Sequence, residues 1–169
     1  MKIRKVTLND AASICNIYNH YIENTAVSFE TEPVSIEKMR QRIDDVTNSG
    51  FPYYVGEIND KVVGYYYIHH WHERRAFSST VEVSIYLDSR QTGKGLGTVL
   101  FEHLLRNIDR ERIHVLMAAI CVPNEGSVKL HEKFGFKQVS LMKEVGWKFD
   151  QWRDIGHWML TFDNPCKHI

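Results

Sequence analysis

The chain has 169 residues, close to the usual size of one domain and long enough for a sizeable hydrophobic core. Hydrophobic residues make up 43% and charged residues 25%, values typical of a globular protein that exclude a disordered or fibrous chain. The 21 Lys and Arg residues balance 21 Asp and Glu residues, so no net charge would draw the molecule onto nucleic acid or an acidic membrane. We therefore expect one domain over residues 1–169 that holds any anionic ligand through a local site.

Cysteine usage and the start of the chain bear on the compartment. Cys15, Cys121 and Cys166 are odd in number and lack C-x-x-C spacing, which argues against a disulfide framework and a structural zinc site. The histidines lack metal-ligand spacing with cysteine or carboxylate partners. The basic start is not followed by the apolar run of a signal peptide, and no window approaches membrane-spanning length. We expect a cytoplasmic protein without a metal centre.

The first third of the chain predicts a strand and two helices. A short strand over 2–6 precedes Thr7 and Asp10, whose spacing is typical of a capping box. Ser35 can cap a second helix, which Gly50 would end. Apolar residues recur at helical spacing after both starts, and the expected buried positions are Ile14, Ile17, Tyr18, Tyr21 and Ile22, then Ile36, Met39, Ile43 and Val46.

From Tyr53 onward, β-branched and aromatic runs alternate with helical patterns. The first three runs read as consecutive antiparallel strands, with a turn at Asn59-Asp60-Lys61 between the first two. The element order indicates a mixed α/β fold with a parallel crossover in the middle. The last two strands are expected to surround an aromatic loop. The predicted segments are strands 53–58, 62–71 and 79–88, a helix over 95–110 that buries Leu96, Val99, Leu100, Leu104 and Ile108, a strand over 113–121, a helix over 125–134 closed by Gly135, and strands 136–143 and 155–162.

A glycine-rich turn, Arg90-Gln-Thr-Gly93-Lys94-Gly95-Leu-Gly97, joins the strand over 79–88 to the following helix. Backbone N–H groups converge at a helix start, and glycine lets the main chain approach a diphosphate without an intervening Cβ. The helix dipole and the side chains of Arg90 and Lys94 favour negative charge. The turn therefore predicts an anion cradle for a phosphate-bearing cofactor.

The spacing of this turn excludes two familiar nucleotide-binding loops. A Walker loop needs a glycine followed by Lys and then Ser or Thr, which is absent. A dinucleotide fingerprint needs G-x-G-x-x-G in an early β-α-β unit, whereas here G-x-G-x-G follows antiparallel strands. The string instead resembles R/Q-x-x-G-x-G/A, the acyl-CoA pyrophosphate loop of the GCN5-related N-acetyltransferases (GNAT). A turn that only joins strand to helix is the alternative.

A second segment, Asn124-Glu-Gly-Ser-Val-Lys-Leu-His-Glu-Lys-Phe-Gly-Phe136, is similar to another signature of that family. Segments 17–22, 25–33, 80–86 and 147–158 resemble the phosphinothricin acetyltransferases within it, so the resemblance covers nearly the whole chain. It implies the GNAT acyl-CoA N-acyltransferase fold, with a mostly antiparallel central sheet flanked by helices. It also implies acetyl-CoA as co-substrate, a homodimer, and direct acetyl transfer to the α-amine of a small amino acid or analogue of the phosphinothricin, methionine sulfoximine or methionine sulfone type.

The resemblance implies roles for individual residues. Glu82, in an otherwise apolar strand, matches the subfamily's proposed base; a solvated carboxylate is the alternative. His131 stands where many relatives carry the tyrosine that protonates the leaving thiolate, and a packed or surface histidine is the alternative. Asn124 could bind cofactor amides or only cap a helix. The implied cofactor contacts are the backbones of Ile85, Tyr86 and Leu87, the turn residues Arg90, Gly93, Lys94, Gly95, Leu96, Gly97 and Thr98, and Asn124 and Ser127.

The loop over 71–77 resembles the subfamily's acceptor loop. An arginine there can hold an acceptor carboxylate through two parallel hydrogen bonds, and Arg74 is favoured because it aligns with an arginine of that loop. Solvated loop arginines are the alternative, above all for Arg75. Trp71 and Phe29 would shape the acceptor pocket. The aromatic residues that could line the pocket, the dimer contact or the core are Trp147, Phe149, Trp152 and Trp158.

Two other functions stay open. A non-catalytic acyl-CoA sensor would keep the glycine-rich turn without turnover, and the presence of Glu82 and His131 argues against it. A protein or ribosomal acetyltransferase of the same fold would need an open acceptor groove. The aromatic, arginine-containing loop instead favours a closed pocket for a small anion.

Overall fold

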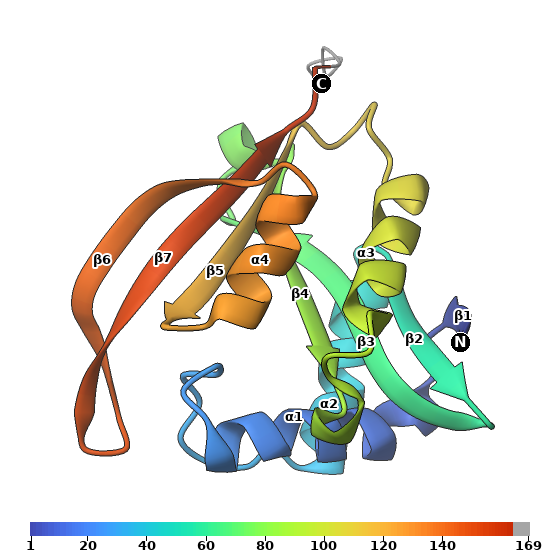
Figure 1. Cartoon of the computed structure of the whole chain (residues 1–169). Coiled ribbons are helices and arrows are strands. Elements are labelled where there is room, and N and C mark those ends of the chain that lie inside the picture. Colours follow the sequence, from blue (N-terminus) through green and yellow to red (C-terminus); the bar gives the residue numbers. More distant parts are fainter. Residues whose placement is uncertain (164–169) are drawn as a thin grey trace. The chain divides into compact units, whose positions relative to one another are not determined.

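Seven strands form one hydrogen-bonded sheet, in the order β1-β2-β3-β4-β5-β7-β6, in the computed structural model, which describes residues 1–163 (Figure 1). β4 and β5 pair in parallel, whereas the β1–β2, β2–β3, β5–β7 and β6–β7 pairs are antiparallel. The predicted mixed α/β fold with a mostly antiparallel sheet is therefore confirmed. The elements are β1 Lys2–Lys5, α1 Ala11–Asn24, α2 Ile36–Asn48, β2 Tyr53–Ile58, β3 Lys61–His70, β4 Thr80–Leu87, α3 Leu96–Asn107, β5 Val115–Val122, α4 Glu125–Lys133, β6 Lys137–Lys148 and β7 Gln151–Thr161.

The chain divides into two compact units. Unit 1 contains residues 1–25, 32–68 and 84–108, and unit 2 contains residues 26–31, 69–83 and the described residues from 109 onward. The expectation of one domain over 1–169 stays a prediction, and Cys166 lies outside the described residues. Among the described helices, none combines the length and the apolar composition that crossing a bilayer requires.

The two helix starts predicted in unit 1 are confirmed. The Asp10 carboxylate accepts a hydrogen bond from the backbone N–H of Thr7 at 2.8 Å, just before α1 begins. Ser35 Oγ accepts from the backbone N–H of Lys38 at 3.1 Å and so caps α2. Ile36 was expected on the buried face of α2, but its side chain is 48% exposed because it stands in the first turn, before the buried Met39.

Helix α3 packs close to the strands of unit 1 because two glycines leave room for it. Leu100 is fully buried, and a Cβ placed on Gly56 or Gly64 would lie 3.2 Å from its side chain. Leu104 is also fully buried. Val99, which was expected in the core, is 41% exposed because it lies off the face that Leu100 and Leu104 bury. This packing holds α3, which begins within the glycine-rich turn, against the strands of unit 1.

A charged cluster ties β1 to β2 and to the start of α1. Arg4 donates to both carboxylate oxygens of Asp10, at 2.8 and 2.7 Å, and to Glu57 at 2.9 Å. Burial raises the pKa of Asp10, but the hydrogen bonds from Arg4 and Thr7 outweigh it and leave this pKa below its ordinary value of 3.8. The ion pairs therefore stabilise the fold above the ordinary carboxyl pKa and lose their effect as pH falls through the lower value in the folded state.

Arg4→Met should lower the free energy of unfolding at pH 7 by about 2–3 kcal/mol, because it leaves the buried Asp10 carboxylate without its charged partner. For a chain of this size the loss corresponds to a fall in melting temperature of roughly 5–10 °C. The difference from wild type should shrink when thermal unfolding is repeated at a pH below the ordinary carboxyl range. Arg40→Met, at an exposed position of α2, is the control. The assignment is contradicted if Arg4→Met lowers the melting temperature no more than Arg40→Met does. It is also contradicted if Arg4→Met lowers the melting temperature equally at both pH values.

In unit 2, α4 lies across β5 (Figure 1), and Trp158 of β7 packs in the core at 3% exposure. The Trp158 indole N–H donates to Glu132 of α4 at 3.2 Å. Trp147 and Trp152 instead pair across the β6–β7 hairpin with ring centroids 5.1 Å apart and are more than half exposed. The structure thus separates the aromatic residues that the sequence left together: Trp158 is core and the others lie on the hairpin surface.

The prediction of an aromatic loop between strands 136–143 and 155–162 is wrong. β6 and β7 continue through that segment and meet at a two-residue turn, so the hairpin appears as a long twisted ribbon (Figure 1). The turn residues Phe149 and Asp150 have φ values of 53° and 54°. Such turns usually carry Asn-Gly or Asp-Gly, and the sequence Phe-Asp gives no such signal.

Candidate functional site

The glycine-rich turn of unit 1 has the geometry expected of an anion cradle. Gly93 and Gly95 have φ values of 73° and 76°, in the left-handed region that favours glycine. A Cβ added to either residue would meet no protein atom within 4 Å, so the space above this backbone is open. Gly95 is the N-cap of α3 and has no side chain that could accept from the first-turn amides. An anion can accept from those N–H groups instead, and the residues therefore fit a phosphate group.

Asp88 organises the approach to this turn. Its backbone N–H donates to the carbonyl of Val63 at 2.8 Å, and its carboxylate accepts from the backbone N–H of Arg90 at 3.0 Å. The same carboxylate pairs with the Arg90 guanidinium at 3.0 and 2.6 Å, which lowers the pKa of Asp88. Lys94 Nζ donates to the Arg90 carbonyl and to Gln91 Oε1, each at 3.0 Å. Arg90 and Lys94 thus brace the turn and keep their cationic groups exposed beside it.

Tyr21 of α1 supports the strand that leads into the turn. Its hydroxyl donates to the carbonyl of Leu87 at 2.6 Å, and burial raises its pKa. The ring of Tyr86 packs between Tyr18 and Tyr21, with centroid distances of 5.2 and 5.5 Å. The roles of Tyr21 and Asp88 as supports of the turn were not predicted from the sequence. The Asp-Ser pair before a helical turn could have revealed Asp88, whereas Tyr21 read as an ordinary core position.

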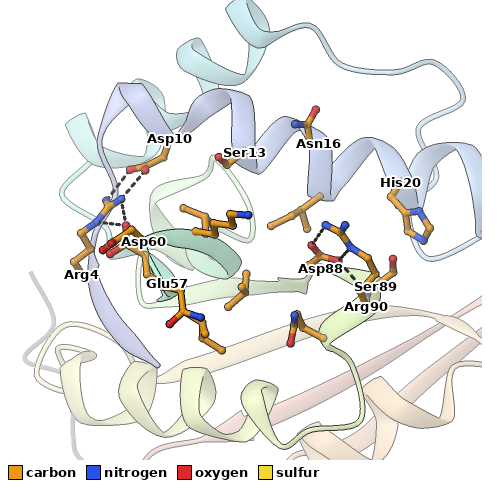
Figure 2. Close-up of a pocket in the computed structure, with 17 residues that line it drawn as sticks. Arg4, Asp10, Ser13, Asn16, His20, Glu57, Asp60, Asp88, Ser89 and Arg90 are labelled. Atoms are coloured by element: carbon orange, nitrogen blue, oxygen red, sulfur yellow. Dashed lines mark hydrogen bonds and ion pairs between the residues drawn. The ribbon is translucent and has the colours of Figure 1, made fainter.

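Asp88 and Arg90 also line a cavity of about 930 Å³ (Figure 2). Ser13, Asn16 and His20 of α1 line one side of it, the Arg4 cluster lies at one end, and Asp88–Arg90 lies at the other. The charged groups that Figure 2 joins by dashed lines are paired within the protein, Arg4 with two carboxylates and Arg90 with Asp88. Because these charged groups pair with one another, they leave no excess of positive charge in this cavity for a phosphate.

Glu82 lies on the half-exposed face of β4, as the alternation of the strand predicted. Its neighbours Val81 and Val83 are 0% and 5% exposed and point to the opposite face. Among the described residues, hydrogen-bonded pairs between β4 and β5 extend only over Thr80–Glu82, although β5 stays paired with β7 as far as Val122. Glu82 is thus the last residue of β4 in this ladder, and Ile85, Tyr86 and Leu87 follow beyond it.

Asn124 caps α4, because its side-chain oxygen accepts from the backbone N–H of Ser127 at 3.2 Å. His131, one turn after Ser127, is only 3% exposed and packs edge-on against Phe136 at a centroid distance of 5.2 Å. His131 Nδ1 lies 2.8 Å from the Ser127 carbonyl oxygen, which can only accept, so Nδ1 carries the proton. Burial lowers the pKa of His131, partly opposed by this hydrogen bond. These facts favour a neutral, packed imidazole, and its role as the thiolate acid stays a prediction.

The predicted acceptor loop is built around an aromatic cluster. Trp71 and Phe77 meet edge-to-face with centroids 5.3 Å apart, and His72 packs on Phe77 at 5.0 Å. Arg74 and Arg75 are exposed, and Arg74 precedes the 3₁₀ turn Arg75–Phe77. Within residues 1–163, the Arg74 guanidinium forms no ion pair with a carboxylate of the chain. Arg74 thus presents an exposed cationic side chain in the loop that holds the aromatic cluster.

Phe29, expected as a pocket wall, lies in segment 26–31 of unit 2 and contacts the backbone of Gly146 in β6. Cys121 is buried, which raises the pKa of its thiol, as expected for an inert core cysteine. No cluster of three or more metal-ligating side chains occurs among residues 1–163. The predicted site residues thus fall into a group around the glycine-rich turn in unit 1 and a group in unit 2 that contains Glu82, Arg74 and Phe29.

Comparisons with known proteins found similar sequences and a similar solved structure. The model of a family described as an acetyltransferase (GNAT) domain matches residues 3–157. The chain is 35% identical to a phosphinothricin N-acetyltransferase of Streptomyces viridochromogenes, over 98% of this chain and 90% of the relative. It is 33% identical to an L-methionine sulfoximine/L-methionine sulfone acetyltransferase of Pseudomonas aeruginosa, over 95% and 94% of the two chains. The solved structure of a putative acetyltransferase from Salmonella typhimurium with its cofactor acetyl-CoA matches with a TM-score of 0.94 and 33% identity, covering 98% of this chain and 96% of that one.

Proposed function

Because the chain belongs to the GNAT acetyltransferase family, we propose that it transfers the acetyl group of acetyl-CoA directly to the α-amine of a small amino acid or analogue. The relatives named for phosphinothricin and for methionine sulfoximine or sulfone give the acceptor class. The observation that carries the proposal is the open glycine cradle at Gly93 and Gly95, at the start of α3.

The chain's own residues would hold the cofactor by its charged end. The backbone amides of Gly95, Leu96, Gly97 and Thr98 would donate to the diphosphate, with Arg90 and Lys94 adding positive charge beside it. The end of the β4–β5 ladder at Glu82 supports backbone contacts from Ile85, Tyr86 and Leu87 to the pantetheine arm. Asn124 and Ser127 would bind its amides. When bound, acetyl-CoA supplies an acetyl group activated as a thioester.

Glu82 would act as the general base. An α-amine has an unperturbed pKa of roughly 8, so most acceptor molecules must lose a proton before they attack a carbonyl carbon. The Glu82 carboxylate, at the last ladder position of β4, would take that proton directly or through one water. Arg74 would hold the acceptor carboxylate, with Arg75, Trp71 and Phe29 shaping the pocket and fixing the attack geometry.

Arg74→Ala should raise the KM of an amino-acid acceptor about tenfold and leave kcat and the KM of acetyl-CoA within about twofold, because one charge-assisted contact to the acceptor is lost. Steady-state assays of thiol release measure both constants. The matched control is the methyl ester of the same acceptor, which has no carboxylate and should be acetylated equally by both proteins. Equal KM values for the free acid in the two proteins would contradict the clamp.

We also propose a homodimer, as the resemblance to the subfamily implies. β6 is the last strand of the sheet, and exposed apolar side chains gather on the hairpin, including Trp147 at 53% and Trp152 at 58% exposure. Light scattering at micromolar concentration should give the mass of two chains, and the mass of one chain would contradict the proposal.

We further propose that the protein is cytoplasmic. The buried free thiols of Cys15 and Cys121 support a reducing compartment.

A screen of acetyl transfer tests the function against its alternatives. Purified protein, acetyl-CoA and a panel of amino acids with their phosphorus and sulfur analogues should release thiol with some of the small acceptors. Binding of acetyl-CoA without thiol release across the panel would favour a sensor. Transfer to protein amines alone would favour a protein acetyltransferase.

A further inference from the structure

Two contacts tie segment 26–31 to the hairpin β6–β7. The Nζ of Lys148 donates to the carbonyl oxygen of Ser28 at 2.6 Å, and the ring of Phe29 lies against the backbone of Gly146. All four residues belong to unit 2. Adjacent residues of the segment are thus held in two ways, Ser28 through its main chain and Phe29 through its side chain.

Gly146 is the point at which the Phe29 ring reaches the strand. A Cβ at this position would lie 1.9, 2.4 and 2.9 Å from three carbons of the ring, well inside van der Waals contact. Any other residue would push the ring away from the strand. A glycine inside a strand often marks such a close approach, and here it fixes the distance between Phe29 and the hairpin.

Lys148 is only 4% exposed, a rare environment for lysine. Burial lowers its pKa, while the nearby Cys121 and Glu30 partly oppose the shift. Its ammonium nitrogen lies 5.1 Å from the centroid of the Phe149 ring. A buried ammonium costs free energy unless it is hydrogen-bonded, and an apolar side chain would fill the same space without that cost. What lysine adds at this position is the contact of its ammonium with the Phe149 ring and, as its tie to segment 26–31, the hydrogen bond to Ser28.

We propose that Lys148 and Gly146 are positioning residues for the acceptor. They hold segment 26–31 against the hairpin, so that Phe29 presents a fixed wall to the aliphatic part of the acceptor's side chain. The inference rests on the proposed function, in which Phe29 contacts the acceptor. Lys148 acts through Ser28 and Phe29 and touches neither the reacting atoms nor acetyl-CoA. It therefore belongs to acceptor recognition alone.

Lys148→Met should raise the KM of the acceptor about tenfold, the size expected when a hydrogen bond from a charged donor is lost. The kcat and the KM of acetyl-CoA should stay within about twofold, and Lys148→Arg should recover part of the affinity. Lys143→Met, on the exposed part of the same strand, is the matched control and should behave as wild type. Equal rises in both KM values, or no rise in either, would overturn the inference.

A double variant tests whether Lys148 acts through Phe29. Combined with Phe29→Ala, Lys148→Met should raise the acceptor KM no further than Phe29→Ala does alone, because residues on one path are not additive. If the double variant instead raises the acceptor KM by the product of the two single fold-changes, Lys148 acts independently of Phe29 and the inference fails.

Hydrogen exchange separates this inference from the proposed function, since it needs no acceptor. Amides of residues 26–31 should exchange at least about tenfold faster in Lys148→Met than in wild type, while amides of β5 keep their rates. If the exchange responds in this way but wild-type protein acetylates no acceptor, the proposed function is wrong and the tie to the hairpin stands. Unchanged exchange over 26–31 removes the tie itself.

Discussion

Glu82→Gln should lower kcat by about 100- to 1,000-fold, the usual contribution of a positioned general base. The amide has nearly the same shape as the carboxylate, so the KM of acetyl-CoA should stay within about twofold. Part of the rate should return as pH rises toward the pKa of the acceptor amine, because solvent then removes the proton that Glu82 removes in the wild type. Steady-state rates across a pH series measure all three effects.

The control for this variant is Glu111→Gln, an exposed carboxylate outside the proposed machinery, which should leave kcat unchanged. Thermal unfolding should give nearly equal melting temperatures for wild type and both variants, since Glu82 is half-exposed and stands on the polar face of β4. A Glu82→Gln protein with wild-type kcat would remove the base from the account.

Gly95→Ala should raise the KM of acetyl-CoA about 10- to 100-fold, because a methyl group in the open space of the turn displaces the diphosphate from one or two charge-assisted hydrogen bonds, each worth roughly 1.5–3 kcal/mol. The left-handed backbone at Gly95, with φ at 76°, adds a folding cost of about 1 kcal/mol. Calorimetric titration of acetyl-CoA should show the same loss as a weaker Kd.

Gly50→Ala separates the two effects. Gly50 has a nearly identical φ of 74°, is exposed, and follows α2 outside the glycine-rich turn. It should lose a similar amount of stability while keeping the wild-type affinity for acetyl-CoA. If both variants bind acetyl-CoA with equal affinity, any loss of affinity in Gly95→Ala reflects backbone strain, and the cradle assignment is wrong.

The glycine-rich turn could be predicted from the sequence because its signals are local. Gly93 and Gly95 stand in a short pattern, and the strand before them and the helix after them each have a clear hydrophobic period. The caps at Ser35 and Asn124 were predictable for the same reason. Glu82 could be assigned to a strand face by alternation, but its role still depends on the resemblance to the family.

The features that sequence reasoning missed depend on contacts between distant residues. Lys148 reaches Ser28 across 120 positions, and Arg4 reaches Glu57 across 53, so no local pattern records either pair. The turn at Phe149–Asp150 was missed because both residues have positive φ without the Asn-Gly or Asp-Gly sequence that usually marks such a turn. The burial of His131 was open for a related reason: helical spacing alone does not show which face packs against Phe136.

Acetyl transfer can be observed by mass spectrometry of the acceptor after wild-type protein is incubated with acetyl-CoA and an amino acid analogue such as phosphinothricin or methionine sulfone. We expect an acceptor that carries one added acetyl group on its α-nitrogen, formed together with one equivalent of free thiol. This product should be lost with Glu82→Gln. An acceptor recovered unmodified across the whole panel, from folded protein that binds acetyl-CoA, would contradict the proposed transfer.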